Sequence, residues 1–387
     1  MDTLRKKLTK SIILGILLIL ATSCFLFTGC GSMQPGSSET LMPGTSPLGT
    51  EKTAESTGAS QTENTSISKP ENTPPIEDPG LYAINPLTGV RNMNKANEGK
   101  RPIAVMISNI KQANPQNGIT ACDMFYEIPA EGGIPRIMGL FADVTDIPLI
   151  GSIRSTRDYY VQLALGYNAI LAHFGTSTSA ESMIKKYSMN NLEGMNLADI
   201  FPQDPVRLKN MGATHSRVTS GEKISTAIGR KKYDMNTGVG GGKAFDFYNQ
   251  QDFTVDGTMD CNKVTAEFSG SYTSYFTYDP VTKLYGKHQF NAPHVDDKGA
   301  QIKVTNVIVI HTPMKVLDVQ KHIEVNLSSG SGYYISGGKA KEIKWSKGAD
   351  TNPIKYTNMD GSALCVNAGK TYICIVGSAS KIILSPT

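Results

Sequence analysis

Two arginines stand three residues apart in GSIRSTRDYY, residues 151–160, directly before a predicted helix. Ser155 and Asp158 fit the S-x-x-[DE] pattern of a capping box, in which each side chain bonds a backbone N–H of the first turn. A helix N-terminus is already electropositive, so Arg154 and Arg157 add charge of the same sign there. This placement requires a negative partner.

Two sources of that negative charge remain open. In the first, Glu127, Glu131 or Asp143 pairs with the arginines inside the fold, in a network that only fixes loop geometry. In the second, the arginines and the free N–H groups of the helix hold an anionic group of a ligand. Arg136 belongs to the same neighbourhood, because YEIPAEGGIPR leaves one predicted strand and enters the next.

Histidines are the next candidates for chemistry. His173 ends a predicted core strand, His215 lies in the loop ATHSRV, and His294 lies in APHVDD. None has the His-E-x-x-His spacing of a helical zinc site, and no Cys/His cluster occurs. We therefore predict neither a metal site nor a cofactor.

Motifs for nucleophilic catalysis are absent from the sequence. There is no G-x-S-x-G elbow, no S-x-x-K with K-T-G, and no phosphate-binding G-x-x-x-x-G-K-[ST]. The glycine-rich GVGGGK, residues 238–243, is interpreted as a loop. His173 or Glu131 remains a candidate general acid or base, so whether the chain is an enzyme stays open.

The N-terminus resembles a bacterial lipoprotein signal. Four basic residues precede the apolar run SIILGILLILATSCFLF, and FTGC ends at Cys30. We predict a signal peptide over residues 1–29 and a lipid on Cys30; the alternatives are an uncleaved anchor and a lipobox at Cys24. Residues 30–80 are rich in Ser, Thr and Pro, which predicts a disordered tether.

Charge and cysteine usage narrow the class of protein. The net charge is +4, and removal of residues 1–29 leaves it near +1, which excludes the concentrated basic face of a nucleic-acid-binding protein. Four further cysteines have no C-x-x-C spacing: Cys122, Cys261, Cys365 and Cys374. The segment between Cys365 and Cys374 predicts a hairpin, with either a disulfide or, as we favour, two buried thiols in neighbouring strands.

The elements that would position these residues alternate between strand and helix. Strands are predicted at 101–108, 123–129, 136–143 and 168–175, with helices following GSIRS and at 179–188. This order predicts an α/β domain over residues 81–234 with a mixed, partly parallel sheet, whose strand ends would collect a ligand. Short strands and turns follow, so residues 235–387 are predicted to be a β-rich C-terminal domain.

Several ordered motifs resemble one family. RPIAVMISN, DMFYEIPAEGGIPRIMGLF, GSIRSTRDYYVQLA, AILAHFG and GSGYYISGGKAKEIKW are similar to the YerB-like lipoproteins of Gram-positive bacteria, over roughly residues 81–384. The resemblance implies a two-domain extracellular lipoprotein of no established biochemical function. In addition, SIRSTRDYY resembles the stretch by which LytR-type envelope glycopolymer ligases hold a lipid pyrophosphate.

These observations lead to one main hypothesis and two alternatives. The main hypothesis is a lipid-anchored protein on the extracellular face of the cell membrane with a cleft for an anionic cell-envelope ligand. Its predicted ligand-binding residues are Arg154, Arg157, Glu131, Arg136, His173 and His215. The alternatives are an envelope enzyme acting on a lipid-linked precursor by phosphoryl or glycosyl chemistry, and a protein-binding scaffold.

Overall fold

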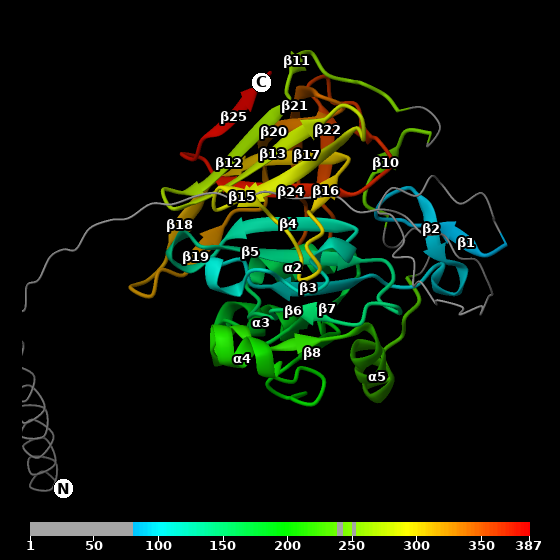
Figure 1. Ribbon diagram of the computed structural model, residues 1–387, viewed down its shortest axis with the longest axis vertical. Helices are drawn as coiled ribbons and strands as arrows, with labels where there is room; N and C mark the ends of the chain where they lie inside the picture. Colours follow the sequence, from blue (N-terminus) through cyan, green and yellow to red (C-terminus); the bar gives the residue numbers. More distant parts are fainter. Residues whose placement is uncertain (1–79, 238–242, 250–252) are drawn as a thin grey trace, which may run out of the picture. The chain divides into compact units, whose positions relative to one another are not determined.

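The computed structural model describes residues 80–237, 243–249 and 253–387 of the 387-residue chain (Figure 1). The described residues belong to one folded unit. The predicted signal peptide, Cys30, the tether up to residue 79, and most of GVGGGK lie outside the described residues.

A long mixed sheet runs through the folded unit and contains strands from both predicted segments. Its strands, in spatial order, are β11 (Met259–Asp260), β21 (Lys339–Ser346), β20 (Ser329–Ser336), β17 (Asn306–Thr312), β24 (Thr371–Gly377), β4 (Met124–Pro129), β5 (Pro135–Phe141), β3 (Ile103–Ile107), β7 (Ile170–His173) and β8 (Asn191–Glu193), with β22 (Lys355–Asn358) paired to β21. The pairs β17–β24, β24–β4, β3–β7 and β7–β8 are parallel, and the other pairs are antiparallel.

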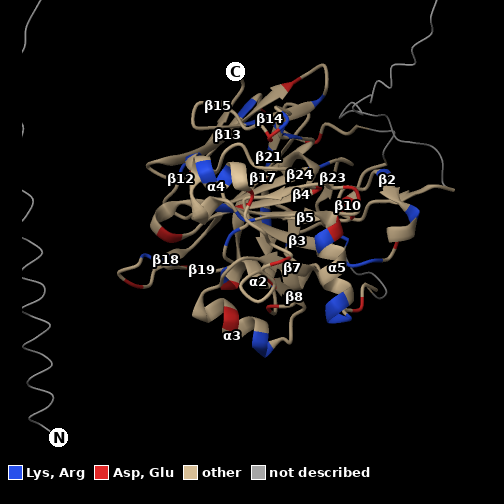
Figure 2. Ribbon diagram, turned by 60° about the horizontal axis from the view of Figure 1, so that its bottom comes forward, with Lys and Arg blue, Asp and Glu red and all other residues tan. Residues whose placement is uncertain are grey.

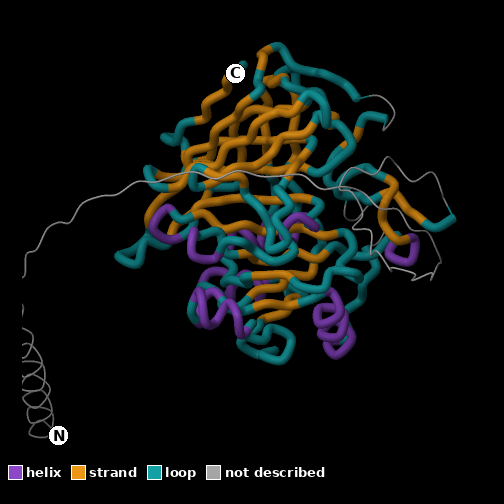
Figure 3. The backbone as a smooth tube through the Cα atoms, viewed as in Figure 1, coloured by secondary structure: helices purple, strands orange, loops and turns teal. Residues whose placement is uncertain are grey.

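A second, antiparallel sheet is built from the C-terminal segment alone. Its strands are β15 (Ala292–Pro293), β14 (Leu284–Gln289), β13 (Tyr272–Asp279), β12 (Lys263–Ser269) and β25 (Ile382–Ser385), with β16 (Lys303–Val304) paired to β14. In SYTSYFTYDPVTKLYGKHQF two alternating runs flank the turn DPVT, a pattern that predicts a hairpin, and β13 does pair antiparallel with β14. Figure 3 shows this part of the molecule as strand and loop, with the helices gathered at the other end.

Helices and short strands complete the unit. The helices are α2 (Asp158–Gly166), α3 (Thr178–Lys186), α4 (Pro205–Met211) and α5 (Gly221–Lys231), with 3-10 turns η1 (Lys95–Asn97), η2 (Lys111–Ala113), η3 (Ile119–Ala121), η4 (Glu131–Gly133) and η5 (Ala213–His215). Two-stranded sheets pair β1 (Tyr82–Ile84) with β2 (Arg91–Asn94), β6 (Ile150–Gly151) with β9 (Val218–Thr219), β10 (Asp246–Phe247) with β23 (Cys365–Val366), and β18 (Met314–Val316) with β19 (Ile323–Val325).

The long sheet separates two hydrophobic cores. Alternation along β4 sends Met124 and Tyr126 to the core that includes α2, and Phe125 to the core shared with the second sheet. The latter core also receives Ile224 of α5 and Val264 of β12. Strands buried on both faces read as continuous apolar runs, which is why 101–108 and 123–129 are recognisable from sequence.

The predicted fold class is confirmed, with one local correction. The N-terminal segment has a mixed sheet with parallel pairs and four α-helices among the described residues, and the C-terminal segment is rich in antiparallel strands. The predicted capping box is wrong, because α2 has Arg157 as its N-cap and no side-chain cap bond. Ser155 instead donates from Oγ to the carbonyl oxygen of Phe174 at 3.0 Å.

The cysteine prediction is correct in chemistry and wrong in placement. All four described cysteines are free thiols, and burial raises the pKa of Cys261 to about 11. However, Cys365 is only half-buried, and its strand β23 pairs with β10, whereas Cys374 lies buried in β24 between β17 and β4. The two thiols therefore do not face each other across a hairpin.

Candidate functional site

The segment before α2 crosses the carboxyl ends of the parallel strands β3 and β7. The backbone N–H of Arg154 donates to Met106 O of β3 at 2.9 Å, and its carbonyl accepts from Phe174 N, just beyond β7, at 3.1 Å. Gly175 packs against the same segment, at φ +86°, and a Cβ there would come within 2.7 Å of Ser155 Oγ. These contacts fix the positions of the two arginines at the sheet edge where ligands of α/β proteins commonly bind.

Glu131 is the acid that neutralises part of the positive charge. One of its carboxylate oxygens accepts from Nη2 of Arg136 at 2.6 Å, and the other accepts from Nε of Arg157. Burial raises the pKa of the Glu131 carboxyl group. The hydrogen bond from Arg157 and the charge of Arg136 outweigh burial and hold this pKa below its usual value. Glu131 is therefore an anion at neutral pH, bound by two arginines.

Arg154 has no such partner. Its Nη1 donates to the carbonyl oxygen of Thr214 at 3.1 Å, and no carboxylate of the described residues lies within ion-pair distance of its guanidinium. Burial lowers the pKa of Arg154, the nearby charges of Arg136 and Arg157 lower it further, and the more distant charge of Glu131 acts in the opposite direction. We call Arg136, Arg154, Arg157 and Glu131 the arginine edge. Two of its three guanidinium groups bind its one carboxylate, and its formal charge is +2.

The start of α2 provides less free positive potential than the sequence suggests. The carboxylate of Asp158, the first residue of the helix, lies against the backbone N–H groups of Asp158 and Tyr159. Burial raises the pKa of Asp158 and outweighs these contacts. The helix thus supplies its own acid at the N-terminus, and the unmatched charge of the edge resides on the side chains.

His215 lies in the 3-10 turn η5, next to Thr214, whose carbonyl oxygen accepts from Arg154. The turn is held by Arg207 of α4, which is 5% exposed and donates from Nε to His215 O at 3.1 Å. The other guanidinium bonds of Arg207 go to Ala113 O, Pro115 O and Asn117 Oδ1, at 2.6–2.9 Å. Because all these acceptors are neutral groups of the fold, Arg207 has a structural role and joins η5 to the segment around residues 113–117.

His173 lies at the same edge and is buried against an acid. Its Nδ1 is 3.0 Å from a carboxylate oxygen of Glu193, and its Nε2 is 3.2 Å from Asn191 Oδ1. Only 1% of its surface is exposed. Burial raises the pKa of Glu193, but the hydrogen bond and charge of His173 together with backbone N–H groups hold it below its usual value.

The remaining acids that were candidate partners of the arginines lie elsewhere. Asp143 accepts from the backbone and side chain of Thr145. Glu127 faces the second sheet, is fully buried, and lies 3.6 Å from Nζ of Lys287. Of the three acids, only Glu131 contacts the arginines.

Sequence reasoning missed Lys287, Glu193 and Arg207. Lys287 stands in the alternating strand LYGKHQ, where the polar positions indicate an exposed face, yet it is fully buried. No local signal marks it, because its acidic partner Glu127 comes from a distant segment and the contact with His294, seven residues later, depends on the turn between β14 and β15. Glu193 offers a weak signal, since it ends a short strand that follows the strand of His173 in the chain.

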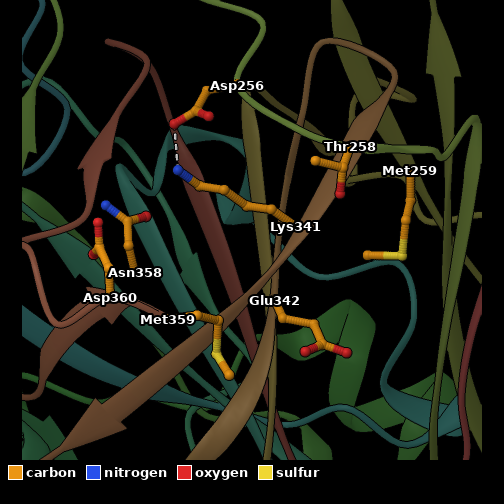
Figure 4. A pocket seen from close by; sticks show the side chains of 8 residues that line it. All are labelled: Asp256, Thr258, Met259, Lys341, Glu342, Asn358, Met359 and Asp360. Atoms are coloured by element: carbon orange, nitrogen blue, oxygen red, sulfur yellow. Dashed lines mark hydrogen bonds and ion pairs between the residues drawn. The ribbon is translucent and has the colours of Figure 1, made fainter.

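Other features of the described residues do not suggest a competing anion site. A surface hollow of about 670 Å³ lies between β11, β21 and β22, and Figure 4 shows its acids Asp256, Glu342 and Asp360 with a single base, Lys341, paired to Asp256. Within the described ranges, no three His, Cys, Asp or Glu side chains gather as they would around a metal ion. Figure 2 shows basic and acidic positions scattered over both ends of the unit.

The fold defines a class of proteins in which a helix-bearing mixed sheet continues into a β-rich C-terminal segment. Two models of one family match the chain: the N-terminal domain of the protein of unknown function DUF3048 over residues 87–234, and its C-terminal domain over residues 264–373. The chain therefore belongs to the DUF3048 family.

A relative from Bacillus subtilis (strain 168), the candidate lipoprotein YerB, is 27% identical over 302 residues, which cover 75% of this chain and 85% of that protein. The crystal structure of YerB protein from Bacillus subtilis shares the fold, with a TM-score of 0.68 and 23% identity over 78% of this chain and 99% of that one. In the part of the chain that the structure describes, no helix has the length and hydrophobicity to cross a bilayer.

Proposed function

We propose that this chain is an extracellular lipoprotein, anchored to the membrane through Cys30, that binds an anionic cell-envelope ligand at the arginine edge. Arg154 would contact the anion, with Arg136 and Arg157 contributing positive charge and Glu131 orienting them. His173 and His215 would border the site. The proposed domains, residues 81–234 and 235–387, would supply the site and a β-rich support, respectively.

One observation carries the binding part of the proposal: Arg154 is a half-buried arginine with no carboxylate of the described residues within ion-pair distance. An arginine loses hydration when it is partly buried, and acceptors must offset this cost. Arg207 has four neutral acceptors, whereas the guanidinium group of Arg154 has one, the carbonyl oxygen of Thr214. Here Glu131 is already bound by Arg136 and Arg157, so the excess charge remains. An anion from outside the chain would supply the missing charge.

The location rests on the N-terminal sequence and on a relative. FTGC at residues 27–30 is similar to a lipobox, and the relative YerB is named as a candidate lipoprotein. Residues 30–80 are rich in Ser, Thr and Pro, the composition from which the sequence predicts a tether. An anchored chain of this kind would meet wall polymers and lipid-linked precursors, both of which are anionic.

We do not extend the proposal to catalysis by His173 or Glu131. His173 is 1% exposed and its ring nitrogens contact Glu193, Gly175 and Asn191. Both carboxylate oxygens of Glu131 already accept from arginines. Neither group is therefore free to exchange a proton with a bound ligand in this arrangement.

The first prediction tests the role of Arg154 in binding. In the full chain incorporated into nanodiscs, Arg154→Ala should weaken binding of a radiolabelled anionic wall glycopolymer by at least about tenfold, the effect expected for one charge-assisted hydrogen bond. The matched control is Arg230→Ala, which removes an exposed arginine paired with Asp199 on the surface. Equal affinities of wild type and Arg154→Ala, at equal melting temperatures, would refute the binding proposal.

Arg157→Ala is a less informative variant than Arg154→Ala. Arg157 contacts Glu131, so its removal also releases a carboxylate toward the ligand. Loss of binding could then come from the missing cation or from the freed anion. Arg154 contacts only a carbonyl oxygen through its guanidinium, so its removal changes one charge.

A further inference from the structure

A ring nitrogen of His215 is left without a partner beside Arg154. Its Nδ1 is buried and has no hydrogen-bond partner among the described residues. We infer that the anion bound at the arginine edge ends in a phosphate or pyrophosphate group carrying at least two negative charges, and that Nδ1–H of His215 donates to one of its oxygens. This inference rests on the proposed function and names its ligand class.

The backbone of η5 holds His215 in place. Its N–H donates to Gly212 O at 3.1 Å, and its carbonyl oxygen accepts from Ser152 Oγ at 2.5 Å and from Arg207 Nε at 3.1 Å. Buried polar atoms of folded proteins are nearly always hydrogen-bonded, so an unpaired nitrogen in such a fixed turn calls for an explanation. A ligand oxygen that also accepts from Arg154 would satisfy it.

Arg154 connects this nitrogen to the arginine edge. Its guanidinium reaches the turn through the bond to Thr214 O, the residue before His215, and it is close enough to Arg136 and Arg157 for their charges to act on it. The donors of Arg154 and His215 come from different segments, the loop before α2 and η5. A tetrahedral group, whose oxygens point in several directions, can accept from both.

The charge of the edge favours a dianion over a carboxylate. With Glu131 in place the edge has a formal charge of +2, so a single carboxylate would neutralise half of it. The position between the guanidinium groups of Arg136 and Arg157, where a carboxylate would fit, is already filled by Glu131. A phosphate or pyrophosphate end group supplies both charges at the position that remains, next to Arg154.

The protonation of His215 should follow the ligand. Burial lowers the pKa of His215, and the charges of Arg154, from the loop before α2, and Arg207, from α4, lower it further. The imidazole is therefore neutral at pH 7 in the free protein. A bound dianion reverses the sign of the nearby charge and raises this pKa, so binding takes up a proton, and His215 strengthens binding as the pH falls.

Equilibrium dialysis of radiolabelled inorganic pyrophosphate against the full chain in nanodiscs tests the inference. His215→Ala should weaken binding by about tenfold, in line with one hydrogen bond to a charged group, whereas His215→Asn, whose amide nitrogen replaces Nδ1, should retain most of it. His322→Asn, at an exposed histidine paired with Asp318, is the control and should bind like wild type. Phosphate should compete more strongly than acetate.

The pH profile separates a donor from a merely structural role. Pyrophosphate itself loses charge in acid, so the measured quantity is the ratio of wild-type to His215→Asn affinity, in which this loss cancels. The ratio should rise as the pH falls from 8 to 5.5. A flat ratio together with unchanged binding by His215→Ala would overturn the inference.

Two further arms separate the sources of the phosphate and the two levels of the proposal. Vesicles with and without an isoprenyl pyrophosphate lipid distinguish a lipid-linked end group from a free one, since only the former would bind the chain to the loaded vesicles beyond its own anchor. If Arg154→Ala abolishes binding while His215→Ala does not affect it, the anion site stands and the phosphate inference fails. If Arg154→Ala has no effect, both fail.

Discussion

At the scale of residues, the distinctive feature of this protein is an imbalance between bases and acids in one small region. Two of the three arginines at the edge share Glu131, and their side chains are 10% and 12% exposed. Such ion pairs contribute little net stability, yet removing one member is costly because the other charges stay buried. The excess of arginines over acids at the edge therefore does not stabilise the fold. The proposed binding of an anionic ligand would account for it.

Replacement of Glu131 by glutamine should change stability and affinity in opposite directions. Glu131→Gln leaves Arg136 and Arg157 without an anion and should lower the free energy of unfolding by about 2 kcal/mol, less than for a fully buried pair, because Glu131 is 24% exposed. The formal charge of the edge rises by one, so pyrophosphate should bind more tightly. Denaturant unfolding and dialysis measure the two effects.

The acid dependence of this difference has a definite sign. The folded-state pKa of Glu131 lies below its usual value of 4.5, so its ionisation stabilises the fold above that pH and the contribution is lost as the pH falls through the folded-state pKa. The stability gap between wild type and Glu131→Gln should therefore shrink in acid. A gap that stays constant down to pH 2 would show that the ion pairs are not its source.

At the scale of elements, α2 is tied to the strand ends that bear the arginine edge. The hydroxyl of Tyr160 lies 3.0 Å from Ile128 O and 2.8 Å from Arg136 O, and Tyr159 donates to Pro129 O at 2.9 Å. Two of these carbonyls precede Glu131 closely in the chain, and the third belongs to Arg136. The helix thus positions the edge through two adjacent tyrosines and not through a capping box.

Loss of the Tyr160 hydroxyl should be more costly than loss of a half-buried hydroxyl with one acceptor. Tyr160→Phe leaves two buried carbonyl oxygens without this donor and should lower the free energy of unfolding by about 1–2 kcal/mol. Tyr233→Phe, where a half-buried hydroxyl donates to Asn191 O, should cost clearly less. Chemical denaturation of both variants decides this, and equal losses would contradict the proposed tie.

The strands and helices were largely predictable from the sequence, whereas the contacts between segments distant in the sequence were not. Apolar runs identify β3, β4, β5 and β7, and the helical spacing of Tyr159, Leu163 and Tyr167 identifies α2, because these signals are local. The capping box failed since Arg157, and not Ser155, begins the helix. Glu131 could be named among three candidate acids, but only the antiparallel pairing of β4 with β5 places η4 beside the arginines.

At the scale of the whole molecule, the predicted boundary near residue 235 does not interrupt the long sheet. Strand β24, from the far C-terminus, pairs parallel with β4 on one side and with β17 on the other. Parallel pairing between such distant segments leaves no local trace in a sequence. The division into domains 81–234 and 235–387 therefore remains a prediction. It can be tested by asking whether the two segments unfold in one transition or in two.

A buried ion pair joins the same two segments. Glu127 of β4 and Lys287 of β14 are fully buried with 3.6 Å between their charged atoms, and Glu127 also accepts from Asn109, Ser274 and Tyr372. Nζ of Lys287 donates to Oε1 of Gln289 in its own strand at 2.9 Å, and it also lies 2.9 Å from His294 Nδ1. Burial lowers the pKa of Lys287, and Glu127 partly restores it.

These connections predict that the described unit unfolds as a whole. Scanning calorimetry of the full chain should show one transition for residues 80–387. Lys287→Met should shift all of it downward, with a loss of about 3 kcal/mol, because the buried carboxyl group of Glu127 would lose its cation. Lys339→Met, which breaks an exposed pair with Asp260, should cost at most about 1 kcal/mol. Two separate transitions, of which Lys287→Met shifts only that of residues 235–387, would instead show that residues 81–234 and 235–387 unfold independently. The continuous sheet would then not couple the arginine edge to the C-terminal strands.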